Sequence, residues 1–389
     1  MRRTALLASC LALTMTTPGL AIGEPPGASD RFGWERVVLD DDFPGAYQVE
    51  TADVDGDGRL DVVALGGNVC AWYQNPSWRK RIIAAGADAP GVISSATADL
   101  DGDGKAEVAI ACDFEMNQPR RGRLLLARQG AGLDDPWTLL TVAEIGSIHR
   151  LRWGDLDADG KLDLLVAPIF GPDAAPPAYD DPARLIAFTA WDLHDASKWR
   201  SRPLAERRVT HAIEFLPEFG DSKRPVLLAA DNEGVTLIGP IASDAPPPAV
   251  ELVPGGEGAR PKRGASEIHR GRFHDDRPFL ATIEPWHGTG AVVWSQSRPG
   301  GPFDVRTVLD DTLDDGHALW VVDLDGDGQD EVLSGHRGRN HGVRLFSYAT
   351  DSGTWSGSVV DPGVAAQDLR GGDLDGDGRP DVVAAGGAT

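Results

Sequence analysis

Cysteine is scarce in this chain of 389 residues, which contains only three. Cys10 lies in an apolar N-terminal stretch, so a scaffold built on several disulfides is excluded. Cys70 and Cys112 fall in predicted strands of neighbouring repeats, where they either form one disulfide or stay as two free thiols.

Several functional signatures are also missing. No segment after the N-terminus approaches the roughly 20 apolar residues of a membrane span. The sequence has neither a GxSxG nucleophile elbow nor a glycine-rich phosphate loop between a strand and a helix. It also lacks the basic stripe that binding to a phosphate backbone requires. We therefore expect neither a membrane nor a nucleic acid as a partner, and the oligomeric state is left open.

The first 21 residues have the features of a secretory signal peptide. Arg2 and Arg3 precede an apolar stretch from Ala5 to Met15, and small residues follow as a cleavage site. Residues 22–33 then form an N-terminal linker. The sequence therefore predicts a secreted protein, either extracellular or periplasmic.

Acidic residues dominate the charge, with a formal net charge of −23. Much of this acidity lies in five nine-residue loops of the pattern DxDxDGxxD/E, with carboxylates at positions 1, 3, 5 and 9. Ca²⁺ prefers six to eight oxygen ligands, and crowded carboxylates repel one another unless a cation lies among them. We expect about five structural Ca²⁺ ions. The predicted ligands are Asp53, Asp55, Asp57, Asp61, Asp99, Asp101, Asp103, Glu107, Asp155, Asp157, Asp159, Asp163, Asp323, Asp325, Asp327, Glu331, Asp373, Asp375, Asp377 and Asp381.

The spacing of these loops indicates a repeat. They begin at positions 53, 99, 155, 323 and 373, and the long central gap of 168 residues equals three gaps of 56. Two units without a metal loop therefore lie in the centre, which makes seven units. Each has four short predicted strands, as in a propeller blade. The fold class is all-β: a seven-bladed β-propeller with calcium-binding loops between the first and second strands of five blades. A pair of packed sandwiches is the alternative.

Ring closure gives a further expectation. Residues 34–39 have the pattern of a fourth strand but precede the first metal loop. We expect a single propeller over residues 34–389, with this N-terminal strand closing the last blade. The third strand of that blade has no counterpart in the sequence, which would leave an open edge.

Histidines recur at fixed positions relative to the loops. His149 and His317 each lie six residues before a loop, and His211 and His269 hold similar places in the two central units. An innermost strand needs five or six residues to cross a blade, so these imidazoles should lie near the axis, at the end opposite the acidic loops.

The turn between the second and third strands returns to the same end. It carries His287 in the fifth unit and His336, Arg337 and His341 in the sixth. Neutral imidazoles there could bind a divalent metal such as Zn²⁺ or Mn²⁺, or act as acid and base, with Arg152 and Arg337 neutralising substrate charge. Alternatively, they form hydrogen bonds to the backbone of neighbouring blades.

The repeated acidic motif resembles the FG-GAP/VCBS repeats of integrin-α-type propellers. The stretches 72–78 (WYQNPSW) and 315–323 (DGHALWVVD) resemble the propeller domain of aldos-2-ulose dehydratase/isomerase-like proteins, and propeller-type rhamnosyl-glucuronate lyases are similar. This resemblance implies a carbohydrate ligand and β-elimination. The catalytic candidates are His149, His211, His269, His317, Arg152, Arg337, His336 and His341. The alternative is a non-catalytic propeller that binds glycan or protein, as an adhesion module does.

Overall fold

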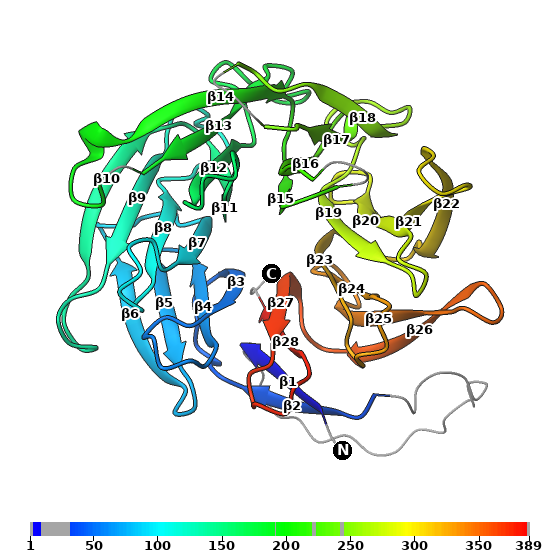
Figure 1. Ribbon diagram of the computed structural model, residues 1–389, viewed down its shortest axis with the longest axis horizontal. Helices are drawn as coiled ribbons and strands as arrows, with labels where there is room; N and C mark the ends of the chain where they lie inside the picture. The colour runs from blue at the N-terminus through cyan, green and yellow to red at the C-terminus, as the bar shows by residue number, and fades with distance from the viewer. Residues whose placement is uncertain (1–2, 9–31, 191, 220–222, 242–244, 387–389) are drawn as a thin grey trace.

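The computed structural model describes residues 3–8, 32–190, 192–219, 223–241 and 245–386. These residues form 28 strands and one short 3-10 helix, Ala196–Lys198. The strands make seven four-stranded sheets that surround a central axis (Figure 1). The prediction of an all-β propeller is confirmed.

Six of the sheets are regular blades of four consecutive antiparallel strands, numbered here one to six in chain order. Blade one comprises β3 (Ala46–Ala52), β4 (Asp61–Gly66), β5 (Val69–Gln74) and β6 (Arg79–Ala85). Blade two comprises β7 (Ser94–Ala98), β8 (Glu107–Cys112), β9 (Arg123–Arg128) and β10 (Thr138–Glu144). Blade three comprises β11 (Ile148–Gly154), β12 (Asp163–Pro168), β13 (Ala183–Thr189) and β14 (Arg200–Arg207). Blade four comprises β15 (Ala212–Leu216), β16 (Val226–Asp231), β17 (Gly234–Ile238) and β18 (Ala249–Pro254). Blade five comprises β19 (Glu267–Arg272), β20 (Pro278–Glu284), β21 (Gly290–Gln296) and β22 (Phe303–Asp310). Blade six comprises β23 (Gly316–Val322), β24 (Glu331–His336), β25 (Gly342–Ala349) and β26 (Thr354–Asp361).

The sheet that closes the ring differs from these six blades. β27 (Ala366–Gly372) and β28 (Asp381–Gly386) are antiparallel, whereas β1 (Arg3–Ala8) runs parallel to both β28 and β2 (Trp34–Val38). The sequence analysis counted seven blades, but the described residues contain six regular ones and a mixed closing sheet. The difference arises because both outer strands of that sheet come from the N-terminal part of the chain, seen beside the C-terminal strands in Figure 1.

The closing sheet contains the segments for which the sequence predicted a signal peptide and a closing strand. β2 lies at its outer edge, where the sequence analysis places residues 34–39, and β1 occupies the third position that has no counterpart in the repeat. β1 belongs to the segment predicted as a signal peptide. The rest of that segment and the linker up to residue 31 lie outside the described residues.

The hydrophobic core lies between neighbouring sheets. Second strands such as β8 and β12 are buried along their whole length, because both of their faces are covered by adjacent blades. Outer strands such as β10 are mostly exposed or half-buried. Cys70 and Cys112 lie in one core cluster between blades one and two, where both are free thiols, so the disulfide alternative is wrong. Burial raises the pKa of Cys112 to about 11.

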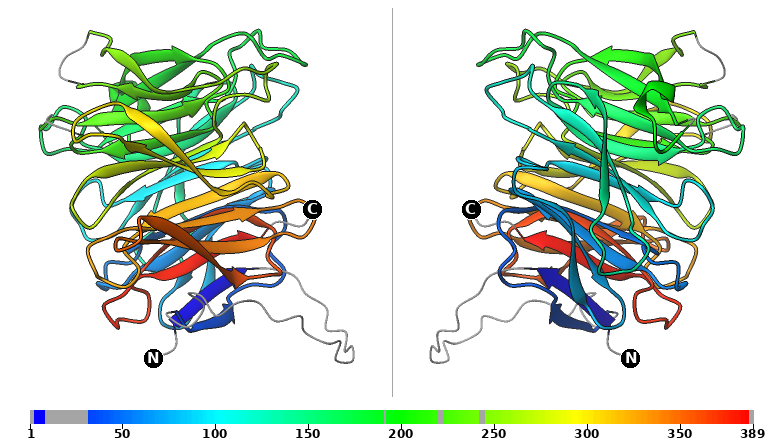
Figure 2. Two further views of the ribbon diagram at one scale, coloured as in Figure 1. Left: turned by 90° about the vertical axis from the view of Figure 1, so that its right-hand side faces the viewer. Right: turned by 90° about the vertical axis from the view of Figure 1, so that its left-hand side faces the viewer.

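The inner strands run between the two rims of the ring, which Figure 2 shows from the side, and they carry the acidic loops at one end and His149 and His317 near the other. Each acidic loop joins the first and second strands of its sheet, so it lies at the end of an inner strand. The glycine at loop position 6 has a φ of 85° to 88°, a left-handed conformation that the tight turn requires and glycine adopts freely. These glycines are Gly58, Gly104, Gly160, Gly328 and Gly378. Among the described residues, no helix has the length and apolar character of a membrane span.

Ring closure can be tested at Phe32, which packs in one cluster with Leu333 of blade six and Leu369 of the closing sheet. We expect Phe32→Ala to lower the free energy of unfolding by about 3 kcal/mol, because it removes a buried ring that touches two sheets. Val38→Ala, at a 46% exposed position on β2, should change it by less than about 0.5 kcal/mol. Equilibrium unfolding in urea measures both, and equal effects would contradict a core role for this segment.

Candidate functional site

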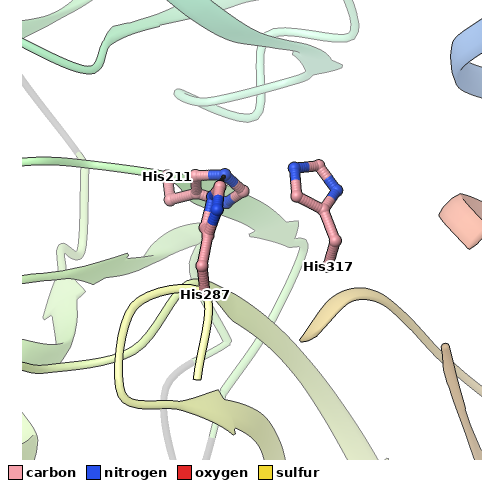
Figure 3. Close-up of side chains that lie close together, drawn as sticks. All are labelled: His211, His287 and His317. Carbon is pink, nitrogen blue, oxygen red and sulfur yellow. Dashed lines mark hydrogen bonds between the residues drawn. The ribbon is translucent and has the colours of Figure 1, made fainter. Parts of the chain in front are cut away.

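Three histidines meet at the axis of the ring (Figure 3). His211 precedes β15, His317 lies in β23, and His287 lies in the turn between β20 and β21. One ring nitrogen from each lies within 4.8 Å of the others. His211 and His317 are each 1% exposed, so the cluster is held inside the protein. The structure therefore brings two of the predicted histidines together with His287.

The Nδ1 atoms of His211 and His317 face backbone carbonyls of the next sheet. His211 Nδ1 lies 2.8 Å from the Ser266 carbonyl oxygen, and His317 Nδ1 lies 2.6 Å from the Gln367 carbonyl oxygen. A carbonyl only accepts a hydrogen bond, so each imidazole carries its proton on Nδ1 and presents the Nε2 lone pair to the cluster. This tautomer is the one that a metal ligand needs.

His287 has two competing neighbours on Nδ1. The Asp315 carboxylate lies 3.0 Å from it, and a guanidinium nitrogen of Arg337 lies equally close. If His287 Nδ1 donates its proton to Asp315, Nε2 has a lone pair. If Nδ1 instead accepts a hydrogen bond from Arg337, Nε2 carries the proton. His287 Nε2 lies 2.9 Å from His211 Nε2, so one proton or one cation must lie between them.

Tyr47 completes the cluster and was missed from the sequence. Its hydroxyl oxygen lies 2.9 Å from His149 Nε2 and 3.3 Å from His317 Nε2, and His149 Nδ1 faces the His211 carbonyl oxygen at 3.0 Å. The signal was available: Tyr47 lies six residues before the first acidic loop, at the offset that selects His149 and His317.

Burial sets the protonation states of the cluster. It is the largest influence that lowers the pKa values of His149, His211 and His317 well below the usual range. The nearby cation of Arg150 lowers the pKa of all three further. The imidazoles are therefore neutral at pH 7. Burial also raises the pKa of Tyr47, which keeps its hydroxyl protonated.

A buried ion pair lies beneath the cluster. Arg150 and Glu267 are 3.4 Å apart with exposed fractions near 5%, and Glu267 also lies 3.0 Å from His211 Nδ1. Burial and then the repulsion of Arg370 lower the pKa of Arg152 to about 10. The role predicted for Arg152 stays a prediction, whereas Arg150 and Glu267, which were not among the predicted catalytic residues, contact the histidines directly.

His269 does not join the cluster either. It is the third residue of β19, and its Nδ1 lies 3.3 Å from Glu214. The prediction gave His269 a place similar to those of His149 and His317. The turn between β19 and β20 is shorter, so the prediction placed His269 too near the mouth, and Glu267 occupies that level instead.

His336 and His341 lie beside the cluster rather than in it. Both line a separate cavity of about 940 Å³, together with Arg337. Arg337 connects the two places, since its guanidinium also contacts Asp315, Gln367 and His287. Trp286, which precedes His287, is 6% exposed and packs in a small apolar cluster.

Backbone strain accompanies the cluster. His287 has a φ of 48°, its partner Asp315 has a φ of 61°, and Val209, two residues before His211, has a φ of 55°. A left-handed conformation costs a non-glycine residue about 1–3 kcal/mol and is found preferentially at functional sites. The strain at these three positions supports a functional role for the cluster.

The acidic loops form the second group of candidate metal sites. Asp53 accepts backbone hydrogen bonds from Gly56 and Gly58, which folds the loop around its own carboxylates. Asp61, at position 9, accepts the Val54 N–H at 3.0 Å, and the corresponding acids of other loops do the same. Ligand atoms lie within 4.8 Å of one another in sets that include Asp53, Asp55 and Asp57; Asp99, Asp101 and Glu107; Asp155, Asp157 and Asp159; and Asp323, Asp325 and Glu331.

The charges in these loops are unbalanced. Burial first, and then the anions of Asp55 and Asp57, raise the pKa of Asp61 to about 7. Glu107 is raised to about 7 and Asp381 to about 6 for the same reasons. One oxygen of Asp55 is buried without a hydrogen-bond partner. A bound cation would relieve both features, so the donor set suits Ca²⁺.

The structure is a β-propeller with acidic repeat loops and an axial cluster of imidazoles. Residues 53–110 and 323–384 match the FG-GAP-like repeat. The chain also resembles aldos-2-ulose dehydratase of Phanerodontia chrysosporium, with 26% identity over 233 residues, 54% of this chain. That match spans only 25% of the dehydratase.

A solved structure shows the same fold. An Agrocybe aegerita lectin, described for its specific recognition of non-reducing terminal N-acetylglucosamine, superposes with a TM-score of 0.51. The alignment covers 82% of this chain and 81% of the lectin, at 14% sequence identity. At that identity the likeness concerns the fold alone.

Proposed function

We propose that this protein is an exported, calcium-stabilised propeller that acts on carbohydrate by β-elimination at the axial cluster. The observation that carries the proposal is the convergence of neutral imidazoles from His211, His287 and His317 on one point beside the Tyr47 hydroxyl. The sequence similarity to a sugar dehydratase supports the carbohydrate link. Export rests on the N-terminal sequence pattern alone, and cleavage of the predicted signal peptide would remove β1 from the closing sheet.

The cluster suits a divalent transition ion such as Zn²⁺ or Mn²⁺. Imidazole nitrogen is a preferred ligand for such ions, and His211, His287 and His317 would hold it. A bound ion would stabilise negative charge that develops on a sugar carbonyl or carboxylate. In that state Asp315 would accept the Nδ1 proton of His287, and the carbonyls of Ser266 and Gln367 would keep His211 and His317 in the required tautomer.

Tyr47 and His149 are suited to moving the proton. In a β-elimination a base removes the proton from the carbon next to a carbonyl, a C=C bond forms, and the leaving oxygen departs with a proton. The Tyr47 oxygen would take the carbon-bound proton while its own proton passes to His149 Nε2, 2.9 Å away. The protonated His149 would then give this proton to the leaving oxygen.

The metal proposal predicts that purified protein contains about one transition ion in addition to calcium. His317→Ala should lose that ion, because two imidazoles remain where three converge, and should keep its calcium. His194→Ala is the matched control, since His194 lies in the turn between β13 and β14, at the rim of the acidic loops. Elemental analysis by mass spectrometry measures both contents. Retention of the transition ion by His317→Ala would contradict the site.

The mechanism predicts that Tyr47→Phe lowers kcat about 100-fold or more, since the hydroxyl carries the proton, while the transition ion stays bound. Substrates come from a screen of aldos-2-uloses and glucuronate-containing glycans, with turnover followed by the absorbance of the unsaturated product. Unchanged kcat would exclude Tyr47 as the proton carrier. Binding without any turnover would favour the non-catalytic module instead.

The calcium proposal predicts that chelation with EGTA lowers the melting temperature and that Ca²⁺ restores it. Asp53→Asn should lose about one bound Ca²⁺ ion, because it removes a charged ligand from the first loop. Asp351→Asn, at an exposed acid outside the five loops, should lose none. Calorimetry and calcium analysis after gel filtration measure these effects. A melting temperature insensitive to EGTA would contradict structural calcium.

A further inference from the structure

The cavity beside the axial cluster has the size and position of a second binding site. It lies in blade six, between the turn that joins β22 to β23 and the turn that joins β24 to β25. Its volume of about 940 Å³ falls within the range of small-ligand sites, roughly 300–1,000 Å³. Its lining includes Asp314, His336, Arg337, Arg339, His341 and Arg344, and Asn340 lies at the tip of the second turn.

Arg337 lies between this cavity and the cluster. Its guanidinium lines the cavity and also lies 3.0 Å from His287 Nδ1 and 2.8 Å from the Gln367 side chain. A molecule in the cavity is therefore separated from the imidazoles by one side chain. The cavity and the cluster are therefore neighbouring places that a chain-like ligand could occupy together.

The charges of the cavity are balanced within the protein. Arg337 pairs with Asp315 at 2.7 Å, Arg339 with Asp314 at 3.1 Å, and Arg344 with Asp310 at 2.8 Å. Each guanidinium therefore has a carboxylate partner, and the cavity has no surplus positive charge for an anionic group. The paired groups still offer directional hydrogen bonds, which suit a ligand rich in hydroxyl groups.

The two histidines add further hydrogen-bonding groups. His341 Nδ1 lies 3.1 Å from the Gly338 carbonyl oxygen, so Nε2 is the ring nitrogen left for a ligand on this half-buried side chain. His336 is 6% exposed and held by Asp314 through its Nδ1. Neighbouring Asn340 is exposed and has a φ of 54°, a conformation that asparagine tolerates better than most residues.

We propose that this cavity binds a neutral sugar residue of an oligosaccharide or polysaccharide, next to the residue held at the axial cluster. The assignment of that neighbouring residue rests on the proposed function, whereas sugar binding in the cavity does not depend on catalysis. The substrate class is then a glycan chain rather than a free monosaccharide, and its unit in the cavity is uncharged.

Calorimetric titration of the full-length protein tests whether the cavity binds a neutral sugar. The probes are cellotetraose, maltotetraose, xylotetraose and mannotetraose, with tetragalacturonate as the acidic comparison. We expect at least one neutral tetramer to bind more tightly than the acidic one. Asn340→Ala and His341→Ala should each weaken that binding about tenfold, because each removes hydrogen bonds to the sugar. His194→Ala should bind as the wild type does.

Three results would overturn the proposal: no neutral tetramer binds, tetragalacturonate binds more tightly, or both cavity variants bind as the wild type. Metal content and elimination activity of the same samples separate this test from that of the proposed function. Loss of sugar binding with the transition ion retained assigns the effect to the cavity. Sugar binding by a protein without elimination activity would leave the cavity in place and refute the enzyme.

Discussion

The hydrogen bond from an imidazole Nδ1 to a backbone carbonyl of the next sheet is the interaction on which the axial site depends. His149, His211 and His317 each make it, to the carbonyls of His211, Ser266 and Gln367. One bond ties two sheets together, fixes the tautomer and aims Nε2 at the axis. The structural and functional interpretations of these histidines are therefore not alternatives, because the same contact satisfies both.

The mixed closing sheet makes this arrangement depend on both ends of the chain. Gln367 supplies its carbonyl from β27, and the core beside β27 is covered by Phe32 and Trp34 of the N-terminal segment. Loosening that sheet would displace the acceptor of His317. Ring closure is thus coupled to the geometry of the site, although the closing residues are far from the imidazoles in the sequence.

The sequence repeat made the propeller fold and several of the axial residues predictable. A fixed offset from the acidic loops identified His149 and His317 because an inner strand has nearly constant length, and the same offset selects Tyr47. It failed at His269, where the shorter turn before β20 shifts the register, and at the closing sheet, where parallel pairing of β1 leaves no mark in a repeat pattern. Glu267 and Asp315 were missed because their roles depend on contacts between distant segments.

The separation of acids and imidazoles has an electrostatic reason. An inner strand of six residues spans roughly 20 Å, about twice the Debye length at physiological ionic strength. A carboxylate beside an imidazole raises its pKa, as Asp315 does for His287, and the distance to the acidic loops keeps their carboxylates from adding to this effect. Arg150 pairs with Glu267, and the Arg150 cation lowers the pKa values of His149, His211 and His317. One chain can therefore carry sites for a hard cation at one rim and neutral imidazoles at the other, because the length of the strand keeps the two chemistries apart.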